Sequence, residues 1–193
     1  MISIQIATED QKDQILSTTM LSFCMDPFVR WATHDSHQYL TRYADLFMVS
    51  IKAGIANRSV YFSSGFLGIA VWFPPGIYAA DQEIVTAIQN LGPSPLRELM
   101  EEAFEKFLAF HPEVPHWYLP FMGVDPNFQG QGIGSSLLKH VLDICDSKKE
   151  IAYLEASSTR NMYFYERHGF EVLGSFKVGD SPNLFPMIRK PNL

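Results

Sequence analysis

The chain has 193 residues and a formal net charge of −6 at pH 7; 47% of its residues are hydrophobic and 19% are charged. This length suits one domain over residues 1–193, and the composition is that of a globular chain with a sizeable core. Without a basic stripe or cluster, the chain is not expected to bind nucleic acid. Its longest apolar run, 66–73, is far shorter than the roughly 20 residues of a membrane helix, and its start lacks the features of a signal peptide. We therefore expect a cytoplasmic protein without a membrane partner.

The first part of the chain combines one strand with two helices. Residues 2–7 alternate apolar and polar side chains, as a half-buried strand does. Thr8 and Gln11 form a capping box, which predicts that a helix begins here and continues to about Phe23. Apolar side chains recur at helical spacing between residues 37 and 55 and predict a second helix.

A hairpin and a helical segment follow. Residues 59–62 and 66–73 have the composition of strands and flank Ser63-Ser64-Gly65, which is a hairpin signal. Residues 81–110 have helical patterning that breaks at the Gly-Pro-Ser-Pro run 92–95. We interpret this stretch as a helical insertion within the single domain.

The second half contains a strand–helix–strand unit. An aromatic strand is predicted at 116–124, a helix from about 132 to 147 and a buried strand at 151–157. Pro120 cannot donate a ladder hydrogen bond, so an edge, a bulge or a splayed position is expected there. The remaining elements are a helix at 159–168 and strands at 170–178 and 184–190. This order predicts an α/β fold with a mixed sheet around one crossover connection.

The segment VDPNFQGQGIGSSL, residues 124–137, places glycines at alternate positions where a strand becomes a helix. Gly130, Gly132 and Gly134 allow backbone N–H groups to converge, and the free amides and dipole of the helix N-terminus add to an anion site. A Walker loop would need a lysine that is absent here. A dinucleotide fingerprint would need glycine in place of Ser135, which weakens that alternative without eliminating it. Another phosphate-bearing ligand is favoured.

These residues carry a resemblance to a known family. The glycine segment resembles the acetyl-CoA pyrophosphate loop of the GNAT superfamily of N-acetyltransferases, whose pattern Q/R-x-x-G-x-G/A is met at Gln129, Gly132 and Gly134. Residues 154–172 resemble the second cofactor segment of that superfamily, with its Tyr-x-x-x-Gly-Phe run at 165–170. More narrowly, RNMYFYERHGF and MIRKP look like the puromycin N-acetyltransferase branch.

The resemblance implies the acyl-CoA N-acyltransferase fold, in which helices flank a central, splayed mixed sheet. It also implies acetyl-CoA as the donor cofactor and a primary amine as the acceptor, attacking directly in a ternary complex. The residues implied in coenzyme binding belong to the strand before the glycines, to the glycine loop and to the helix after the next strand. They are Met122, Gly123, Val124, Gln129, Gly130, Gln131, Gly132, Ile133, Gly134, Ser135, Asn161, Phe164 and Arg167.

Two side chains are catalytic candidates, because the amine must attack as a neutral group and the leaving thiolate gains from a proton donor. Tyr165 matches the position from which the family protonates the departing sulfur; without the motif it would be interpreted as a core tyrosine. Glu155 ends a buried strand and could serve as the general base, directly or through water, or could be solvated or cap the next helix. Asn161 could be a helix cap and not a coenzyme ligand, and Arg167 could be an ordinary surface residue.

The acceptor pocket is expected in the segments before the glycine loop, which usually wall it in this family. Aromatic side chains and one carboxylate there suit a small-molecule amine with an apolar body, although aromatic residues in such positions more often belong to the core. The candidates are Phe23, Asp26, Phe28, Trp31, Trp72 and Tyr78.

Several alternatives stay open at this point. An acetyltransferase for protein amino groups, a non-catalytic acyl-CoA sensor and a nucleotide-binding protein would share parts of the pattern. No metal site is expected, since His111 and His116 lack a ligand motif. Cys24 and Cys145 indicate no disulfide framework. The chain is expected to be a monomer or a homodimer.

Overall fold

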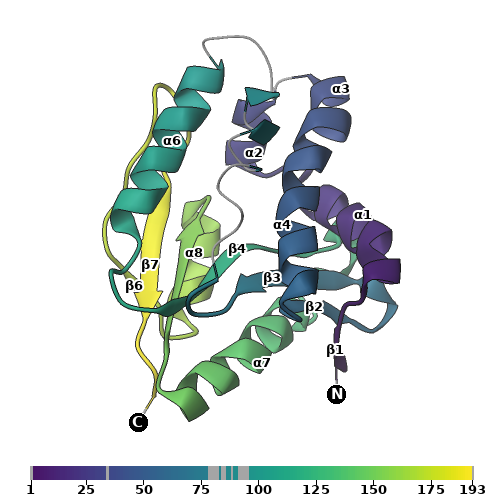
Figure 1. The fold of residues 1–193 in the computed structure, drawn as a ribbon, viewed down its shortest axis with the longest axis vertical. Helices are drawn as coiled ribbons and strands as arrows, with labels where there is room; N and C mark the ends of the chain where they lie inside the picture. Colours follow the sequence, from purple (N-terminus) through teal and green to yellow (C-terminus); the bar gives the residue numbers. More distant parts are fainter. Residues whose placement is uncertain are drawn as a thin grey trace.

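A seven-stranded sheet forms the centre of the computed structural model (Figure 1), which describes residues 2–33, 35–77, 83, 86, 87, 89, 90 and 96–192. The strands are β1 (Ile4–Ile6), β2 (Val60–Ser63), β3 (Gly68–Phe73), β4 (His116–Val124), β5 (Ile151–Ala156), β6 (Glu171–Val172) and β7 (Phe185–Arg189). Their order in space is β1-β2-β3-β4-β5-β7-β6. Among the described strands, β4 and β5 are the parallel neighbours and the other neighbours are antiparallel. The predicted mixed α/β fold is confirmed.

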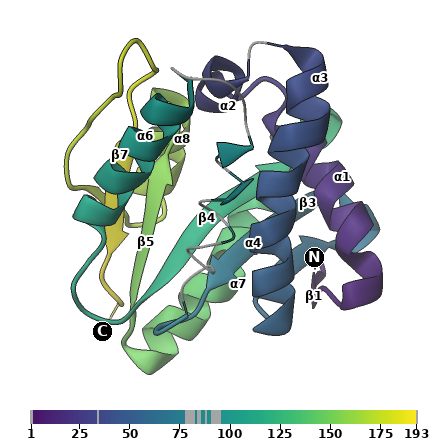
Figure 2. The ribbon, with the colours of Figure 1, turned by 45° about the horizontal axis from the view of Figure 1, so that its top comes forward.

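The parallel pair β4–β5 is complete along only part of its length. Its register ends at Leu119, which pairs with Leu154. At the same point β4 carries a bulge, because Val71 pairs with Phe121 whereas Phe73 pairs with Tyr118, so two steps on β3 match three on β4. Beyond the bulge β4 stays paired with β3, and β5 turns away from it, as Figure 2 shows. The bulge lies at Pro120, in agreement with the prediction from the sequence.

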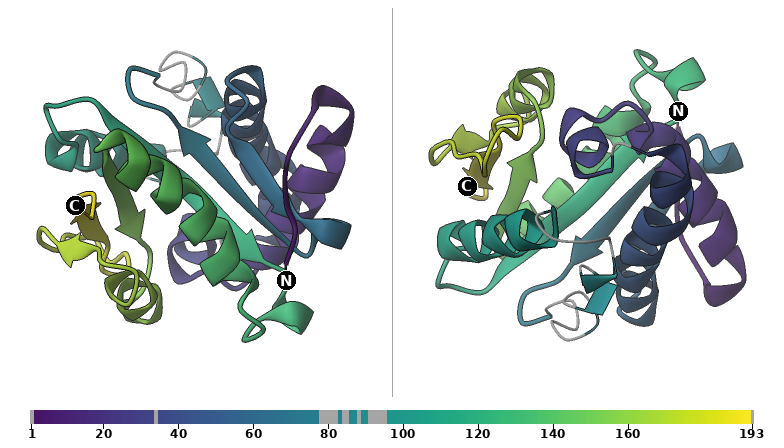
Figure 3. Two further views of the ribbon diagram at one scale, coloured as in Figure 1. Left: turned by 90° about the horizontal axis from the view of Figure 1, so that it is seen from below. Right: turned by 90° about the horizontal axis from the view of Figure 1, so that it is seen from above.

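Helices cover both faces of the sheet (Figure 3). The helices are α1 (Lys12–Phe23), α2 (Pro27–Ala32), α3 (Ser36–Gln38), α4 (Ala44–Ala56), α6 (Leu96–Phe110), α7 (Ile133–Lys148) and α8 (Thr159–Glu166). A π-helical turn at Tyr39–Tyr43 joins α3 to α4, so the helix expected at 37–55 is one run with a local widening. Helix α7 crosses one face, and α1, α2, α4 and α6 lie on the other. In the part of the chain that the structure describes, no helix is long and apolar enough to cross a membrane.

The core accordingly has two halves, one on each face of the sheet. Strand β3 contributes to both: Ile69 and Val71 pack on the side of α1 and α4, whereas Ala70 and Trp72 pack on the side of α7. Trp72 is fully buried there and meets Trp117 edge-on, with ring centroids 6.3 Å apart. Its place corrects the expectation that Trp72 walls an acceptor pocket.

Two other predicted elements differ from the structure. The strand expected at 170–178 is only two residues long, with an isolated bridge from Phe176 to Leu184. The reason is packing: after β6 the chain leaves the ladder, and the Phe176 ring stacks on Phe110 of α6 at 5.6 Å. Of the helical stretch 81–110, α6 is described, while the break at 92–95 lies outside the described residues.

An ion pair ties the end of the sheet to α7. Arg189 of β7 is 4% exposed and donates to both carboxylate oxygens of Asp146, at 2.7 and 2.8 Å. Its Nε also donates to the His168 carbonyl at 3.1 Å. These hydrogen bonds, chiefly the one from the Arg189 side chain, hold the pKa of Asp146 below its ordinary value.

We expect Arg189→Met to lower the free energy of unfolding by roughly 2–3 kcal/mol, slightly less than for a fully buried pair because Asp146 is 24% exposed. A carboxyl with a lowered pKa stabilises the fold above its unfolded-state pKa and loses this contribution as the pH falls through the folded-state value. The difference between the two proteins should therefore shrink in acid. Urea unfolding at several pH values measures it, with Lys106→Met, which breaks the exposed pair with Glu102, as the control. Equal stability of Arg189→Met and wild type at neutral pH would contradict the assignment.

Candidate active site

The glycine loop has the backbone that its sequence predicts. Gly130 and Gly132 have φ angles of 76° and 83°, in the left-handed region, and a Cβ at either position would meet nothing within 4 Å. Glycine is required there by the backbone and not by packing. Gly132 is the N-cap of α7, so the free amides of that helix begin in the loop. Gln129 fastens the loop by donating to the Val124 carbonyl at 3.2 Å.

The other residues predicted for coenzyme binding surround this loop. Gln131 is exposed, Ser135 is half-buried and Ile133 is buried in the core beneath α7. Gly134 lies within α7, where a Cβ would approach Phe164 and Val124 at 3.6 Å. Loop, helix and strand end are thus assembled at one place.

Beyond the bulge, β4 presents an edge toward the opening between β4 and β5. Met122, Gly123 and Val124 pair with β3 on their other side. A Cβ on Gly123 would lie 2.4 Å from the Ser22 Cβ, so glycine here allows α1 to pack directly on the strand. An extended chain that carries amides can add to such an edge as a further strand would.

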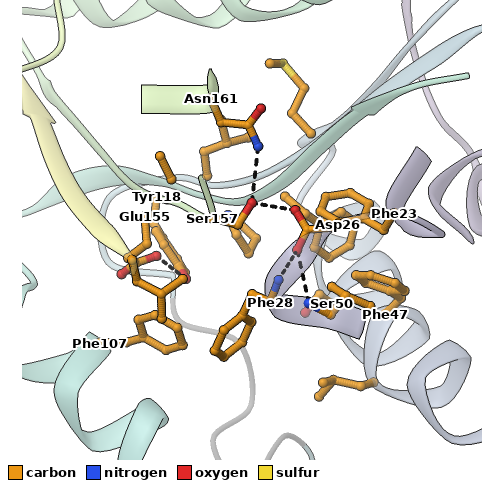
Figure 4. A pocket seen from close by; sticks show the side chains of 18 of the residues that line it. Phe23, Asp26, Phe28, Phe47, Ser50, Phe107, Tyr118, Glu155, Ser157 and Asn161 are labelled. Carbon is orange, nitrogen blue, oxygen red and sulfur yellow. Dashed lines mark hydrogen bonds between the residues drawn. The ribbon is translucent and has the colours of Figure 1, made fainter. Parts of the chain in front are cut away.

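A polar chain crosses the opening from α8 to α2. Ser158 caps α8, and the Asn161 side chain donates to the Ser157 hydroxyl at 3.1 Å. Ser157 in turn donates to one carboxylate oxygen of Asp26, whose other oxygen accepts from the amides of Phe28 and Val29 at the start of α2 (Figure 4). Burial raises the pKa of Asp26. Asp26 thereby holds both Ser157 and the first turn of α2 in place.

A cavity of about 210 Å³ lies between this chain, α4, α6 and the two diverging strands. Its walls are mainly aromatic and include Phe23, Phe28, Tyr43, Phe47, Phe107 and Phe121. Of the acceptor-pocket candidates, Phe23, Asp26 and Phe28 line it. Trp31 stands behind Phe28, with ring centroids 5.4 Å apart, and donates to Asp180 at 2.8 Å. Tyr78 lies outside the described residues.

Tyr165 reaches the cavity wall from α8. Its ring packs against Phe164 and Phe170 at 5.2 and 5.8 Å, and the residue is 9% exposed. Burial, with a smaller contribution from the Asp26 charge, raises the pKa of Tyr165, so its hydroxyl keeps its proton at neutral pH. Arg167, at the end of α8, is exposed with its guanidinium 5.9 Å from the Phe164 ring centre.

Glu155 also lines the cavity and lies one residue beyond the last β4–β5 pair. Its side chain is 7% exposed, and Oε2 accepts a hydrogen bond from the Tyr118 hydroxyl at 3.0 Å. The other oxygen, Oε1, lies 3.4 Å from Nε2 of His111. Glu155 is therefore neither solvated nor the cap of α8, a position that Ser158 fills.

Sequence reasoning missed the partners of Glu155. Tyr118 is separated from it by 37 positions, and the parallel register of β4 and β5 is the signal that could have brought the two together. His111 follows α6 and carries no motif. Within the described residues, no group of three or more His, Cys, Asp or Glu side chains is arranged to hold a metal ion.

Tyr165 and Glu155 both line one cavity. Met122 of the open strand edge lines it as well, and the glycine loop follows that edge in the chain. This arrangement can hold an extended, phosphate-bearing chain along β4 and bring a second molecule, held in the apolar cavity, to its end. The Glu155 carboxylate can then accept a proton from one reactant, and the Tyr165 hydroxyl can donate a proton to the other.

Comparisons with known proteins agree with this geometry. A family model described as an acetyltransferase (GNAT) domain matches residues 97–172. An uncharacterized N-acetyltransferase of Schizosaccharomyces pombe is 25% identical over 99% of this chain and 84% of its own length. A peptidyl-lysine N-acetyltransferase of Salmonella typhimurium is 25% identical over 62% of this chain and 86% of its own length.

A solved structure covers the whole fold. The crystal structure of a histone acetyltransferase HPA2 and related acetyltransferase from Corynebacterium glutamicum superposes with a TM-score of 0.74 and 26% identity, over 100% of this chain and 97% of that one. The narrower likeness to the puromycin branch is not specifically supported by these matches. Taken with the splayed sheet, the glycine loop and the cavity, these matches support an N-acetyltransferase of the GNAT type.

Proposed function

We propose that this enzyme transfers an acetyl group from acetyl-CoA to the primary amine of a small molecule with an apolar body, by direct attack in a ternary complex. The observation that carries this proposal is the aromatic cavity that Glu155 and Tyr165 both line. At about 210 Å³ it is smaller than the roughly 300–1,000 Å³ of common ligand pockets, which favours a compact acceptor. Contact with aromatic rings on several sides favours an acceptor with an apolar or aromatic body.

The coenzyme is assigned to the opening between β4 and β5. Backbone amides of 129–135 and the start of α7 suit its diphosphate. The edge formed by Met122, Gly123 and Val124 suits the amides of its pantetheine arm, and the Asn161 side chain is close enough to the opening to add a hydrogen bond. When bound, acetyl-CoA supplies an activated thioester. The protein supplies orientation, which in aligned reactions is worth roughly 7–11 kcal/mol of the barrier.

We assign the acid and the base to Tyr165 and Glu155, which both line the cavity. Tyr165 carries its proton at neutral pH, so it is placed to donate to a leaving sulfur. Glu155 has one oxygen held by Tyr118, and its other oxygen, Oε1, has no hydrogen-bond partner among the described residues, so it can accept a proton from the amine.

A second candidate function is acetylation of lysine side chains in peptides. The names of the relatives from Salmonella typhimurium and Corynebacterium glutamicum favour it, since one acts on peptidyl-lysine and the other is described as a histone acetyltransferase. A lysine side chain is also a primary amine on an apolar stem.

An acceptor panel tests the proposal. Release of free thiol from acetyl-CoA is measured with phenethylamine, an aminonucleoside, spermidine, free lysine and a lysine-bearing peptide. We expect the highest kcat/KM with phenethylamine, because its ring fills the aromatic cavity. Preference for the peptide would instead establish the second candidate, and thiol release with none of them would contradict both.

Tyr165→Phe should lower kcat roughly a hundredfold, while the KM for acetyl-CoA changes little, because the variant keeps the ring packing and loses only the proton donor. Tyr163→Phe is the matched control, on the same helix but 54% exposed. Steady-state kinetics of both variants measure the effect. An unchanged kcat in Tyr165→Phe would remove the acid role.

Gly132→Ala should weaken coenzyme binding about tenfold, since the left-handed backbone that aims the loop amides becomes strained by about 1–2 kcal/mol and shifts. Gly76→Ala is the control: its φ is 81°, a Cβ there also meets nothing within 4 Å, and it lies outside the loop. Both variants should lose similar stability. Calorimetric titration with CoA separates them, and equal affinity in the two would argue against the loop as the diphosphate site.

A further inference from the structure

A row of polar contacts begins at Glu155 and continues through residues that are not among those lining the cavity. His111 Nε2 lies 3.4 Å from Glu155 Oε1. His111 Nδ1 lies 3.3 Å from His116 Nε2, and His116 Nδ1 lies 2.8 Å from the Val114 carbonyl oxygen. The row therefore has three contacts, and nothing in the coenzyme or acceptor assignments uses the two histidines.

The positions of the hydrogens in this row follow from which of its atoms can only accept a hydrogen bond. The Val114 carbonyl can only accept, so His116 Nδ1 carries a hydrogen. A neutral His116 then has a bare Nε2, and the contact with it needs a hydrogen on His111 Nδ1. Two neutral imidazoles have now used both of their hydrogens. The third contact, between His111 Nε2 and Glu155 Oε1, is left with two lone pairs and no proton.

Surrounding groups keep this arrangement in place. The titratable groups that face the pair, among the described residues, are Tyr118 and His116 of β4 and Tyr153 of β5. Burial raises the pKa of both tyrosines, with the Glu155 charge adding to it, so neither tyrosine ionises near neutral pH. Burial lowers the pKa of His116, so that ring stays neutral. Glu155 Oε1 is buried and has no hydrogen-bond partner.

On the basis of the proposed function, we propose that the gap between Glu155 Oε1 and His111 Nε2 is the place that receives the proton of the acceptor amine. When the C–N bond forms, the nitrogen gives up one proton to Glu155, which shares it with His111. The C–S bond breaks, and the sulfur takes a proton from Tyr165, which solvent replaces. His111, 16% exposed, then returns the stored proton to solvent.

His111 is thus a positioning residue that acts through Glu155. A proton between the two groups makes the third hydrogen bond of the row, and His111 gives a buried base a route to water. A water chain directly from Glu155 is the alternative, and it would not need His111.

The first test uses the free protein and no ligand. Nitrogen NMR of labelled imidazole rings follows proton uptake by each histidine across neutral pH in wild type and in Glu155→Gln. We expect the midpoint of His111 to move to lower pH in the variant, since the anionic partner is gone, while the exposed His37 does not change. Identical titration of His111 in both proteins would overturn the proposal.

The second test is kinetic. His111→Gln should lower kcat for phenethylamine roughly tenfold to a hundredfold, leave the KM for acetyl-CoA unchanged, and move the acid limb of the pH–rate profile to lower pH. His37→Gln is the control, and urea unfolding checks that both variants are folded. A slower enzyme whose acid limb does not move would indicate a purely structural histidine and overturn the proposal. If no amine in the panel is acetylated, the proposed function fails, and the NMR titration still decides on the shared proton.

Discussion

The end of pairing between β4 and β5 is the constraint on which the site depends. Pro120 cannot donate to the ladder, and the bulge at this position ends the parallel register at Leu119 and Leu154. Past that pair each strand has a free side facing the other. Three features then lie in the same opening: the β4 edge, the first residue beyond the register on β5, which is Glu155, and the start of α8. A sheet that stayed paired would bury all three.

Asp26 connects α2 to the segment that begins α8. Its carboxylate caps α2 and accepts from Ser157, which accepts in turn from Asn161. These hydrogen bonds thereby link α2, which contributes Phe28 to the cavity, to α8, which carries Tyr165. Asp26 was predicted as an acceptor-pocket residue, and it lines the cavity while accepting three hydrogen bonds within the protein. Glu155 is left as the cavity-wall acid with an oxygen that can accept.

How far the sequence predicts this site depends on the range of the interactions. Gly130 and Gly132 were identifiable, because a left-handed backbone before a helix is a local property of the chain. Strand β4 was predicted with its observed bounds, since its aromatic run and its proline are local too. Trp72 could not be placed: residues 66–73 are apolar at nearly every position, so periodicity does not tell which side chain faces which half of the core.

Long-range contacts set the remaining limit. Tyr118 and His111 contact Glu155 because of the tertiary fold, in which β4 pairs with β5 and His111 lies next to both strands. The spacing of these residues in the sequence does not predict the contacts. The polar chain from Asp26 to Ser157 joins positions 131 apart. Such contacts follow from the fold as a whole, so a residue-type pattern can name Glu155 and still leave its chemistry open.

Burial favours the neutral form of the titratable groups in and beside this cavity. In an apolar environment each titratable group is held in its neutral form, so Tyr165 remains a loaded donor and His116 remains an uncharged acceptor. Glu155 accepts a hydrogen bond from Tyr118 at Oε2, while Oε1 is buried without a hydrogen-bond partner among the described residues. A buried oxygen without a partner is unfavourable, and a proton that arrives there relieves this cost. The low dielectric that keeps the proton on the phenol also makes its release more costly, whereas a proton that reaches Oε1 of Glu155 fills an unsatisfied position, so the two transfers are favoured by different interactions.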